Sequence, residues 1–401
     1  MSERGRKNPL LPTRLPLLPP GARSRAALGL AVAAAEGRFA LQVCGACGAV
    51  QYPPREICHA CLSERLAWRD VSPAGRLVAA TTVRITADPY FRQRTPWRIG
   101  TVQLDCGPFV IAHLHDDVAD AAAVRMALRL DKSGQGVMLA LPEDGSLDDR
   151  MQAELGSDPR GRRVLVTDVR AGVGQAMARA MLAAGAAEVF AGVADDWKPF
   201  AGADRLGDVS VVPLDVSDAQ SVQRLAGSLG GRVDILVNTG LHLRAGGLIA
   251  RGDTVLAREE MEAAFFGPLR LAQAFGPALR GRGGDGAHAA VAWVNLVSVQ
   301  ALAASPGFSA QAASQAAALS LSHSLRAELR PLRVITALVG PLDDDWHQAV
   351  PPPKVTPAAL AAAVVRALQD GVGELAVGDV AQDIVARWKD DPALLGRELA
   401  G

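Results

Sequence analysis

The chain has 401 residues, enough for two or three domains that each bury a core. Lysine plus arginine and aspartate plus glutamate both total 42, and the resulting net charge of zero argues against duplex DNA or an anionic membrane surface as a partner. No run of about 18 apolar residues predicts a membrane span. We therefore expect no nucleic-acid or membrane partner, and the absence of a signal-peptide pattern favours the cytoplasm.

The N-terminal residues predict a leader followed by a helix. Residues 1–21 combine basic residues with leucines that prolines interrupt, and we expect them to form a disordered leader. The next segment, SRAALGLAVAAAEG (24–37), carries apolar residues at helical spacing and reaches a typical helix-stopping residue at Gly37.

Four of the five cysteines form two Cys-x2-Cys pairs, Cys44 with Cys47 and Cys58 with Cys61, separated by ten residues. Each pair can hold a metal ion from a tight turn, and four thiolates without a further ligand are typical of a closed, structural zinc site. The alternatives are a redox-active dithiol and four ordinary core cysteines. The spacing favours zinc, and we expect the helix and a zinc ribbon to span residues 22–65.

Residues 66–145 alternate short β-like runs with turn signals, which predicts a small barrel or sandwich. The runs are LVAATTVRI (77–85), WRIGTVQL (97–104), PFVIAHLH (108–115) and GVMLALP (136–142).

A helix, the segment CGACGAVQYPPREICHAC and a barrel with WRIGTVQLDCGPFVIAHL follow one another over residues 22–145. This order resembles the family of rubredoxin-like zinc ribbons joined to OB-folds, whose members accompany thiolases and thiolase-like aldolases that act on acyl-CoA thioesters. The resemblance implies a structural zinc ion, a thiolase-family partner, and an OB-fold that docks on this partner and helps to form the channel for the CoA substrate.

The loop ADPYFRQRTPWRIG (87–100) offers candidate CoA ligands in Arg92, Arg94 and Arg98. Guanidinium groups suit the phosphates of CoA, and the three aromatic side chains of the loop suit its adenine. The alternative is a surface loop that an aromatic side chain anchors in the barrel. A nucleic-acid-binding OB-fold is disfavoured, because aromatic residues make up 4% of the chain and no net positive charge is present.

The second half follows a different pattern. Residues 146–161 are charged and rich in turn formers, which predicts a linker. From 162 to 401, apolar strands alternate with helical segments, and this alternation predicts an α/β doubly wound parallel sheet covered on both faces. The predicted strands are 163–168, 188–194, 210–215, 234–238, 290–299 and 333–339.

The turn VTDVRAGVGQAM (166–177) resembles the TGxxxGxG motif of short-chain dehydrogenases, with Asp168 in place of the first glycine. LDVSD (214–218) and ILVNTG (235–240) resemble two further segments of that family, and the resemblance covers residues 162–401. It implies a Rossmann fold that binds NAD(P) at the helix N-terminus after the first strand. The candidate cofactor-binding residues are Thr167, Gly172, Gly174, Asp215 and Asn238.

Asp168 argues against cofactor binding. At about 4–6 Å and an effective dielectric of ~20, its repulsion of a pyrophosphate is a few kcal/mol. Arg170 either offsets this charge or pairs with Asp168 directly. Asp195 and Asp196, after the second strand, are either ribose ligands or part of a solvated turn. The sequence therefore leaves NAD(P) binding open.

The catalytic residues of the dehydrogenase family are Asn, Ser, Tyr and Lys, and most are replaced here. The matching positions hold Ala264, Ser298, Gln311 and Gln315. A glutamine amide cannot give up a proton near neutral pH, and it carries no charge to stabilise a phenolate. His242, His323 and His347 lie apart from this framework in the sequence, and we expect them on the surface or in the core. The run of aspartates at 343–345 predicts a solvated loop.

These patterns favour an accessory, non-catalytic subunit of a thiolase-like acyltransferase or aldolase that acts on acyl-CoA thioesters. In this hypothesis the inactive dehydrogenase-like half is a scaffold that forms a homodimer through the small residues of 312–326. The alternative is an NAD(P)-dependent reductase of a 3-oxoacyl-CoA or a related ketone, with the OB-fold delivering the substrate.

Overall fold

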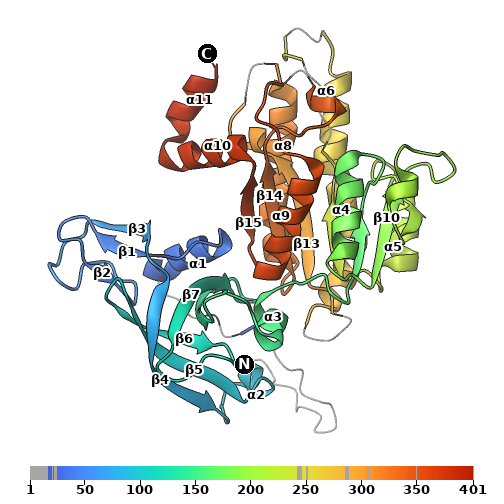
Figure 1. Ribbon diagram of the computed structural model, residues 1–401. Helices are drawn as coiled ribbons and strands as arrows, with labels where there is room; N and C mark the ends of the chain where they lie inside the picture. The colour runs from blue at the N-terminus through green and yellow to red at the C-terminus, as the bar shows by residue number, and fades with distance from the viewer. Residues whose placement is uncertain are drawn as a thin grey trace, which may run out of the picture.

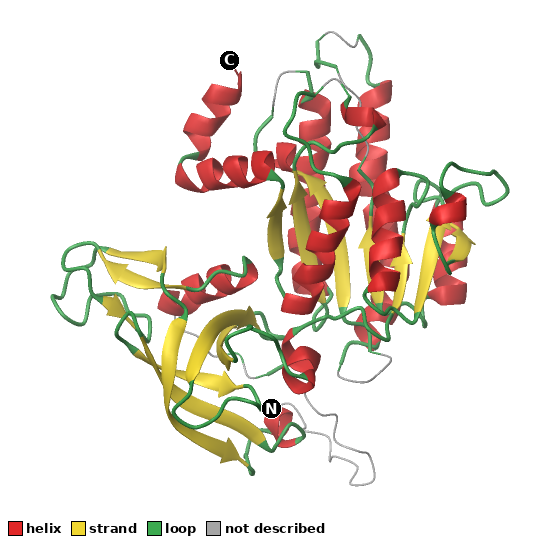
Figure 2. Ribbon diagram, in the orientation of Figure 1, coloured by secondary structure: helices red, strands yellow, loops and turns green. Residues whose placement is uncertain are grey.

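The computed structural model describes residues 17–19, 21, 25–241, 246–249, 252–284, 289–304, 307–348 and 350–400. Most of the predicted leader 1–21, and His242, lie outside these residues. The described chain forms a small zinc-ribbon-like sheet with a helix, a barrel, and a large α/β domain (Figure 1, Figure 2). None of the helices within these ranges has the length and apolar character needed to cross a bilayer.

The N-terminal helix and the small sheet share a core with the barrel. Leu30, Ala33 and Ala34 of the helix belong to the cluster of buried residues that fills the barrel. The helix lies so close to the barrel that a Cβ atom on Gly136 would stand 2.8 Å from the backbone of Leu30. The elements are η1 (Arg25–Ala27), α1 (Leu28–Ala35), β1 (Ala40–Cys44), β2 (Val50–Gln51) and β3 (Leu66–Asp70), with the antiparallel order β2-β1-β3.

The predicted small barrel is confirmed as a closed barrel of order β4-β5-β6-β8-β7. Its strands are β4 (Ala74–Val83), β5 (Trp97–Leu104), β6 (Phe109–Leu114), β7 (Ala123–Leu130) and β8 (Gly136–Leu141), with α2 (Pro89–Arg92) between β4 and β5. The sequence analysis missed β7, because AVRMALRL consists mainly of strong helix formers. Antiparallel pairing with β8 and burial of its inward side chains hold this segment in a strand.

The predicted linker 146–161 contains a helix, α3 (Asp149–Leu155). Asp148 caps it, because its side chain accepts a hydrogen bond from the amide of Met151 at 2.7 Å. Met151 and Leu155 pack with the buried leucines of β8. The connection between the two halves is therefore a packed helix.

The second half contains a seven-stranded parallel sheet of order β11-β10-β9-β12-β13-β14-β15, as the strand–helix alternation predicted. The strands are β9 (Arg163–Val166), β10 (Glu188–Val193), β11 (Ser210–Pro213), β12 (Ile235–Asn238), β13 (Ala292–Ser298), β14 (Arg333–Val339) and β15 (Glu374–Val377). The short edge strand β15 was not predicted. The strand order reverses at β9, and ligands of such sheets bind beyond the carboxyl ends of the strands at this point.

Helices cover both faces of the sheet (Figure 1). The helices α4 and α9 pack on one face, and α5, α7 and α8 pack on the other. Their bounds, with those of the remaining helical segments, are α4 (Gly172–Ala183), η2 (Ala203–Arg205), α5 (Ala219–Leu229), α6 (Val255–Met261), η3 (Glu262–Phe266), α7 (Gly267–Gly281), η4 (Val299–Ala301), α8 (Ser309–Glu328), η5 (Asp345–His347), α9 (Pro357–Asp370), α10 (Asp379–Asp390) and α11 (Pro392–Ala400).

The two halves are joined near the β15 edge of the sheet. The amide of Gly373 donates to the carbonyl of Ala35 at the end of α1, at 2.9 Å. The guanidinium of Arg333 donates to the carbonyls of Leu130 (3.2 Å) and Leu155 (2.7 Å). Burial lowers the pKa of Arg333 to about 10, so its carbonyl partners compensate a real desolvation cost.

Candidate metal centre and candidate active site

The four predicted zinc ligands lie together at one end of the small sheet. The Sγ atoms of Cys44 and Cys61 are 3.6 Å apart, those of Cys47 and Cys58 are 3.7 Å apart, and all four lie within 4.8 Å of one another. A tetrahedral zinc ion with zinc–sulfur bonds of about 2.3 Å separates its sulfur ligands by about 3.8 Å. The four cysteines therefore fit a closed zinc site.

Backbone amides near the cysteines lower the pKa of some of the thiols, and this favours the thiolate form that binds a cation. The amides of Ala46 and Cys47 hold the pKa of Cys44 at about 6, and those of Cys61 and Ala60 lower the pKa of Cys58. The amide of Ser63 lowers the pKa of Cys61, but hydrogen bonds with the other thiols outweigh it and raise that pKa to about 12. Thiols this close share their protons until a cation displaces them.

Each Cys-x2-Cys turn closes with a left-handed residue. Gly48 follows Cys47 with φ +77°, and Leu62 follows Cys61 with φ 59°. Gly48 meets this requirement without strain, and a Cβ atom there would touch nothing within 4 Å. Leu62 adopts the same conformation with a side chain that is 71% exposed. The turn at Leu62 therefore carries conformational strain that the turn at Gly48 does not.

The glycine-rich turn keeps the shape of a dinucleotide site. It connects β9 to α4, and a Cβ atom on Gly174 would stand 1.7 Å from the carbonyl oxygen of Asp168. Gly172 begins α4, and the preceding Ala171 provides no side-chain cap, which leaves the first amides of the helix available. The backbone therefore still suits a phosphate group.

The charges around this turn oppose a phosphate group. Arg170 forms an ion pair with Asp168, with Nε and Nη2 each 3.1 Å from a carboxylate oxygen, which is one of the two arrangements considered from the sequence. Hydrogen bonds to Asp168, with smaller contributions from Asp195 and Asp215, raise the pKa of Arg170. The nearest cation, Arg170, is thus already paired with Asp168. Three carboxylates, those of Asp168, Asp195 and Asp215, lie close to it.

The remaining candidate cofactor residues have protein partners. Asp215 accepts hydrogen bonds from the amide and the hydroxyl of Ser217, at 2.9 and 2.6 Å. Thr167 is buried and accepts from the amide of Thr239. Asn238, also buried, donates to Asn295 at 3.2 Å. Asp195 pairs with Lys198 at 2.9 Å.

The lost catalytic asparagine is replaced by a packed methyl group. Ala264 lies in a π-helical turn, η3, between α6 and α7, and it is buried against Val297 and Ala318. Such turns are frequent at functional sites. The backbone feature is present here without a polar side chain that could support a proton-relay water.

The structure brings Ser298, Gln311 and Gln315 together as the resemblance implied. Ser298 ends β13, and its amide donates to Oε1 of Gln315 at 2.7 Å. Gln311 lies one turn earlier on α8 and is buried. Both glutamines face the serine, as the tyrosine and lysine would, but neither can transfer a proton to a carbonyl.

His347 also lies at this site, which its position in the sequence did not indicate. Together with Ser298 and Gln311 it lines a cavity of about 50 Å³. Asp344, which the sequence analysis placed in a solvated loop, accepts a hydrogen bond from Nδ1 of His347 at 2.7 Å. The spacing Asp344-x-x-His347 was a readable signal, but its position beside Ser298 depends on the path of the loop after β14.

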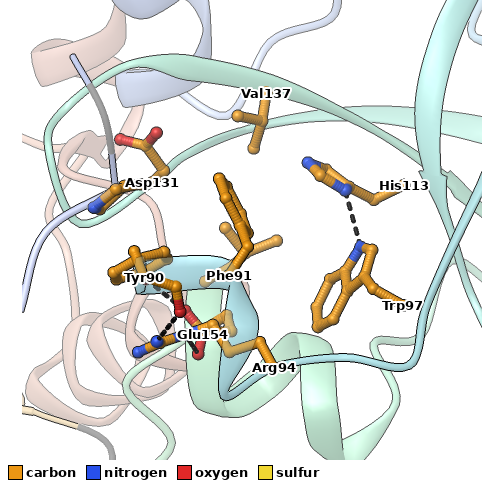
Figure 3. Close-up of a pocket in the computed structure, with 10 residues that line it drawn as sticks. Tyr90, Phe91, Arg94, Trp97, His113, Asp131, Val137 and Glu154 are labelled. Atoms are coloured by element: carbon orange, nitrogen blue, oxygen red, sulfur yellow. Dashed lines mark hydrogen bonds and ion pairs between the residues drawn. The ribbon is translucent and has the colours of Figure 1, made fainter. Parts of the chain in front are cut away.

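The barrel arginines are largely engaged by protein groups. Arg94 pairs with Glu154 of α3 and stacks over the ring of Tyr90, with 3.6 Å between Cζ and the ring centroid (Figure 3). Arg98 donates to the carbonyls of His115, Asp116 and Val118 at 2.8–2.9 Å. The guanidinium of Arg92 donates only one described hydrogen bond, to Ala87, and is exposed.

Comparisons with known proteins match each part of the chain. The family model "short chain dehydrogenase" matches residues 162–351. The model "ChsH2, rubredoxin-like zinc ribbon domain" matches residues 31–67, and "ChsH2, C-terminal OB-fold domain" matches residues 68–131. The three matches follow the order zinc ribbon, barrel, Rossmann-like domain seen in the structure.

Similar proteins cover the second half. A short chain dehydrogenase from Burkholderia cenocepacia J2315, solved in complex with NADP, is 33% identical and has a TM-score of 0.54, over 61% of this chain and 99% of that one. A short-chain dehydrogenase from Streptomyces avermitilis is 27% identical with a TM-score of 0.50, over 59% of this chain and 96% of that one. The "Dehydrogenase/reductase SDR family member 7C" of Rattus norvegicus is 27% identical over 57% of this chain and 75% of its own length.

Proposed function

Because the chain belongs to the short-chain dehydrogenase family in its second half and carries a ChsH2 zinc ribbon and OB-fold in its first, we propose that it is an accessory subunit in acyl-CoA metabolism. Its partner is a thiolase-family acyltransferase or aldolase. The dehydrogenase-like half provides a scaffold and no hydride transfer.

The observation that carries this proposal is the loss of three of the four catalytic groups from an otherwise intact fold. Ala264 fills the asparagine position with a buried methyl group, and Gln315 binds the backbone of Ser298 where a lysine would hold a cofactor ribose. A general acid contributes about 10²–10⁴-fold to a rate. A chain that keeps the sheet and helices without this acid is better suited to assembly than to reduction.

The outer face of the barrel supports a docking role. Val78 on β4 and Phe109 and Ile111 on β6 are 55%, 53% and 66% exposed. The intervening strand β5 places Thr101 opposite Ala79 on one side and Ile111 on the other, so Val78, which precedes Ala79, lies near Ile111 across β5. Exposed apolar residues grouped in this way mark interaction sites. We assign the thiolase partner to this face and place Arg92 on the side of the CoA phosphates.

Co-purification tests the proposed partnership. A tagged chain should retain a thiolase-family protein, and cleavage of an acyl-CoA substrate should require both proteins. The variant Ile111→Asp should weaken retention at least tenfold, whereas Leu394→Asp, at an exposed apolar residue of α11, should leave it unchanged. Retention that resists Ile111→Asp would reject the docking face, and a chain that retains no thiolase-family protein would reject the accessory role.

The zinc site and the homodimer are tested separately. Elemental analysis should find about one zinc ion per chain, because four thiolates complete one tetrahedral site.

The exposed side of α8 carries Ala313, Ala316, Ser320 and Ser324, and we propose that this face forms the homodimer. Light scattering should give twice the 41.8 kDa of the chain, and Ala316→Arg should give the monomer mass. Ala119→Arg, on an exposed barrel turn, is the control.

A further inference from the structure

The small cavity at the carboxyl end of β13 is lined by reactive polar side chains for which the accessory role has no use. It has a volume of about 50 Å³, room for very few water molecules. Ser298, Gln311 and His347 contribute polar side chains to its wall. These residues come from three separate elements, the end of β13, the first turns of α8 and η5 after β14. The fold therefore holds a hydroxyl, an amide and an imidazole around one small space.

The imidazole of His347 has a defined orientation. Asp344 Oδ1 accepts from the ring Nδ1 at 2.7 Å and from the His347 amide at 3.0 Å. Because an ionised carboxylate can only accept, this contact places the proton of the neutral ring on Nδ1 and leaves a lone pair on Nε2. The side chains of both residues are largely buried. His347 is therefore held in the tautomer of a general base.

Within the part of the chain that the structure describes, the hydroxyl of Ser298 donates no hydrogen bond. Its oxygen accepts from the amide of Gln300 at 3.3 Å, and this contact leaves the hydroxyl proton for an acceptor in the cavity. Amide donors are also present. Gln311 lines the cavity, and Nε2 of the neighbouring Gln315 is buried without a hydrogen-bond partner among the residues that the structure describes. Glutamine side chains serve as donors to oxyanions in acyl transfer.

We propose that this cavity is an esterase-type site in which Ser298 is the nucleophile, His347 the general base and Asp344 the positioning residue. Gln311 donates to the oxyanion. Apart from Gln300, the rest of the wall is apolar, with Val299, Phe308, Pro341, Val350 and Val380, and it suits carboxylic esters and thioesters with a short apolar acyl group. This activity goes beyond the accessory role and does not depend on it.

The reaction needs only water as a second substrate. The Ser298 oxygen attacks the acyl carbonyl while Nε2 of His347 takes the hydroxyl proton, and the C–S or C–O bond of the substrate breaks. His347 then gives this proton to the departing thiolate or alkoxide. Water attacks the acyl-serine, His347 takes a proton from it and returns it to the Ser298 oxygen, and the carboxylic acid leaves. Gln311 and Gln315, which cannot support hydride transfer, thus have amide groups that suit acyl transfer.

A fluorophosphonate probe tests the nucleophile directly on the full-length chain without a partner. Peptide mass spectrometry should locate the probe on Ser298, and Ser298→Ala should abolish labelling. His347→Gln should slow labelling by about 10²-fold or more, as expected for loss of a general base. The matched controls Ser228→Ala, at an exposed residue of α5, and His323→Gln, at an exposed residue of α8, should label at the wild-type rate.

Two further measurements complete the test. Butyryl-CoA hydrolysis, followed by thiol release, should show the same order of variants, and Asp344→Glu should recover part of the rate that Asp344→Asn loses. The labelled fraction is normalised to folded protein by thermal unfolding of each variant. Absence of the probe from Ser298 in the folded wild-type chain, or equal labelling of the His347→Gln variant, would overturn the proposal.

Discussion

At the scale of single residues, the two metal-binding turns differ at one position. Gly48 and Leu62 occupy equivalent places after their cysteine pairs, and both have positive φ. Leucine pays for this conformation and gains little in return, because most of its side chain is exposed.

We therefore expect Leu62→Gly to stabilise the zinc-loaded state by about 0.5–1 kcal/mol, which is a two- to fivefold gain in zinc affinity. Competition with a chelator measures it. Gly48→Ala is the reciprocal variant and should lower the affinity. An unchanged affinity in both variants would show that the turns adopt these conformations without zinc.

The replaced residues of the dehydrogenase site lead to a second prediction. The purified chain should not oxidise NADH or NADPH in the presence of a 3-oxoacyl-CoA, because Gln311 and Gln315 supply neither the acid nor the cation. Absorbance at the nicotinamide band checks this. A measurable turnover that disappears in Ser298→Ala would instead support the alternative reductase function.

What the sequence predicted at this scale follows a physical rule. The cysteines and the two glutamines were identified because each lies at a fixed spacing within one turn or one helix. The position of His347 beside Ser298 was not predicted, because the two residues line one cavity only after the loop that follows β14 has folded over the end of β13. Contacts between single residues that are far apart in the sequence leave no periodic pattern in it.

At the scale of elements, two strands with helix-forming residues were missed. β7 carries two arginines and no β-branched residue other than Val124, and β15 is only four residues long. Both are strands because neighbouring strands supply their hydrogen bonds. The longer, more apolar strands of the parallel sheet were predicted within a few residues of their observed bounds.

The helix α3 is fixed to the barrel by a cluster of charges. Glu154 accepts from Tyr90 and Arg94, and Lys132 lies 3.6 Å from it (Figure 3 shows the first three). Burial lowers the pKa of Lys132 to about 8, although Glu154 raises it. The charged ammonium group of Lys132 therefore destabilises the folded chain, because burial removes it from water.

This cost gives stability a defined pH dependence. Between about pH 8 and 10.5 the unfolded chain binds the Lys132 proton more often than the folded chain, so the free energy of unfolding should rise with pH there. Urea unfolding of the zinc-loaded chain at several pH values measures this slope. The variant Lys132→Met should have a flatter profile, and an identical slope in both proteins would contradict the assignment.

At the scale of the whole molecule, the two halves share a hydrogen-bonded joint. Arg333 of β14 donates to carbonyls on β7 and α3, and Gly373, just before β15, donates to the last turn of α1. A further ion pair connects Lys389 with Glu36 at 2.7 Å. This joint was not predictable, because the sequence presented the segment before residue 162 as a linker.

A fragment of residues 162–401 should therefore be less stable than the same residues in the full chain. It loses two of the carbonyls that compensate the buried guanidinium of Arg333, a loss of about 1–3 kcal/mol or more. Thermal unfolding of the fragment beside the full chain measures the difference. Equal midpoints would show that the joint contributes nothing.

The same joint bears on how the molecule avoids self-association. A parallel sheet ends in a strand with unpaired amides and carbonyls, and such an edge can template pairing with another copy. Here α1 stands at the start of β15 and takes up the amide of Gly373. The N-terminal half thus satisfies one backbone group at the start of this open edge, and we expect a fragment that lacks this half to self-associate more readily than the full chain.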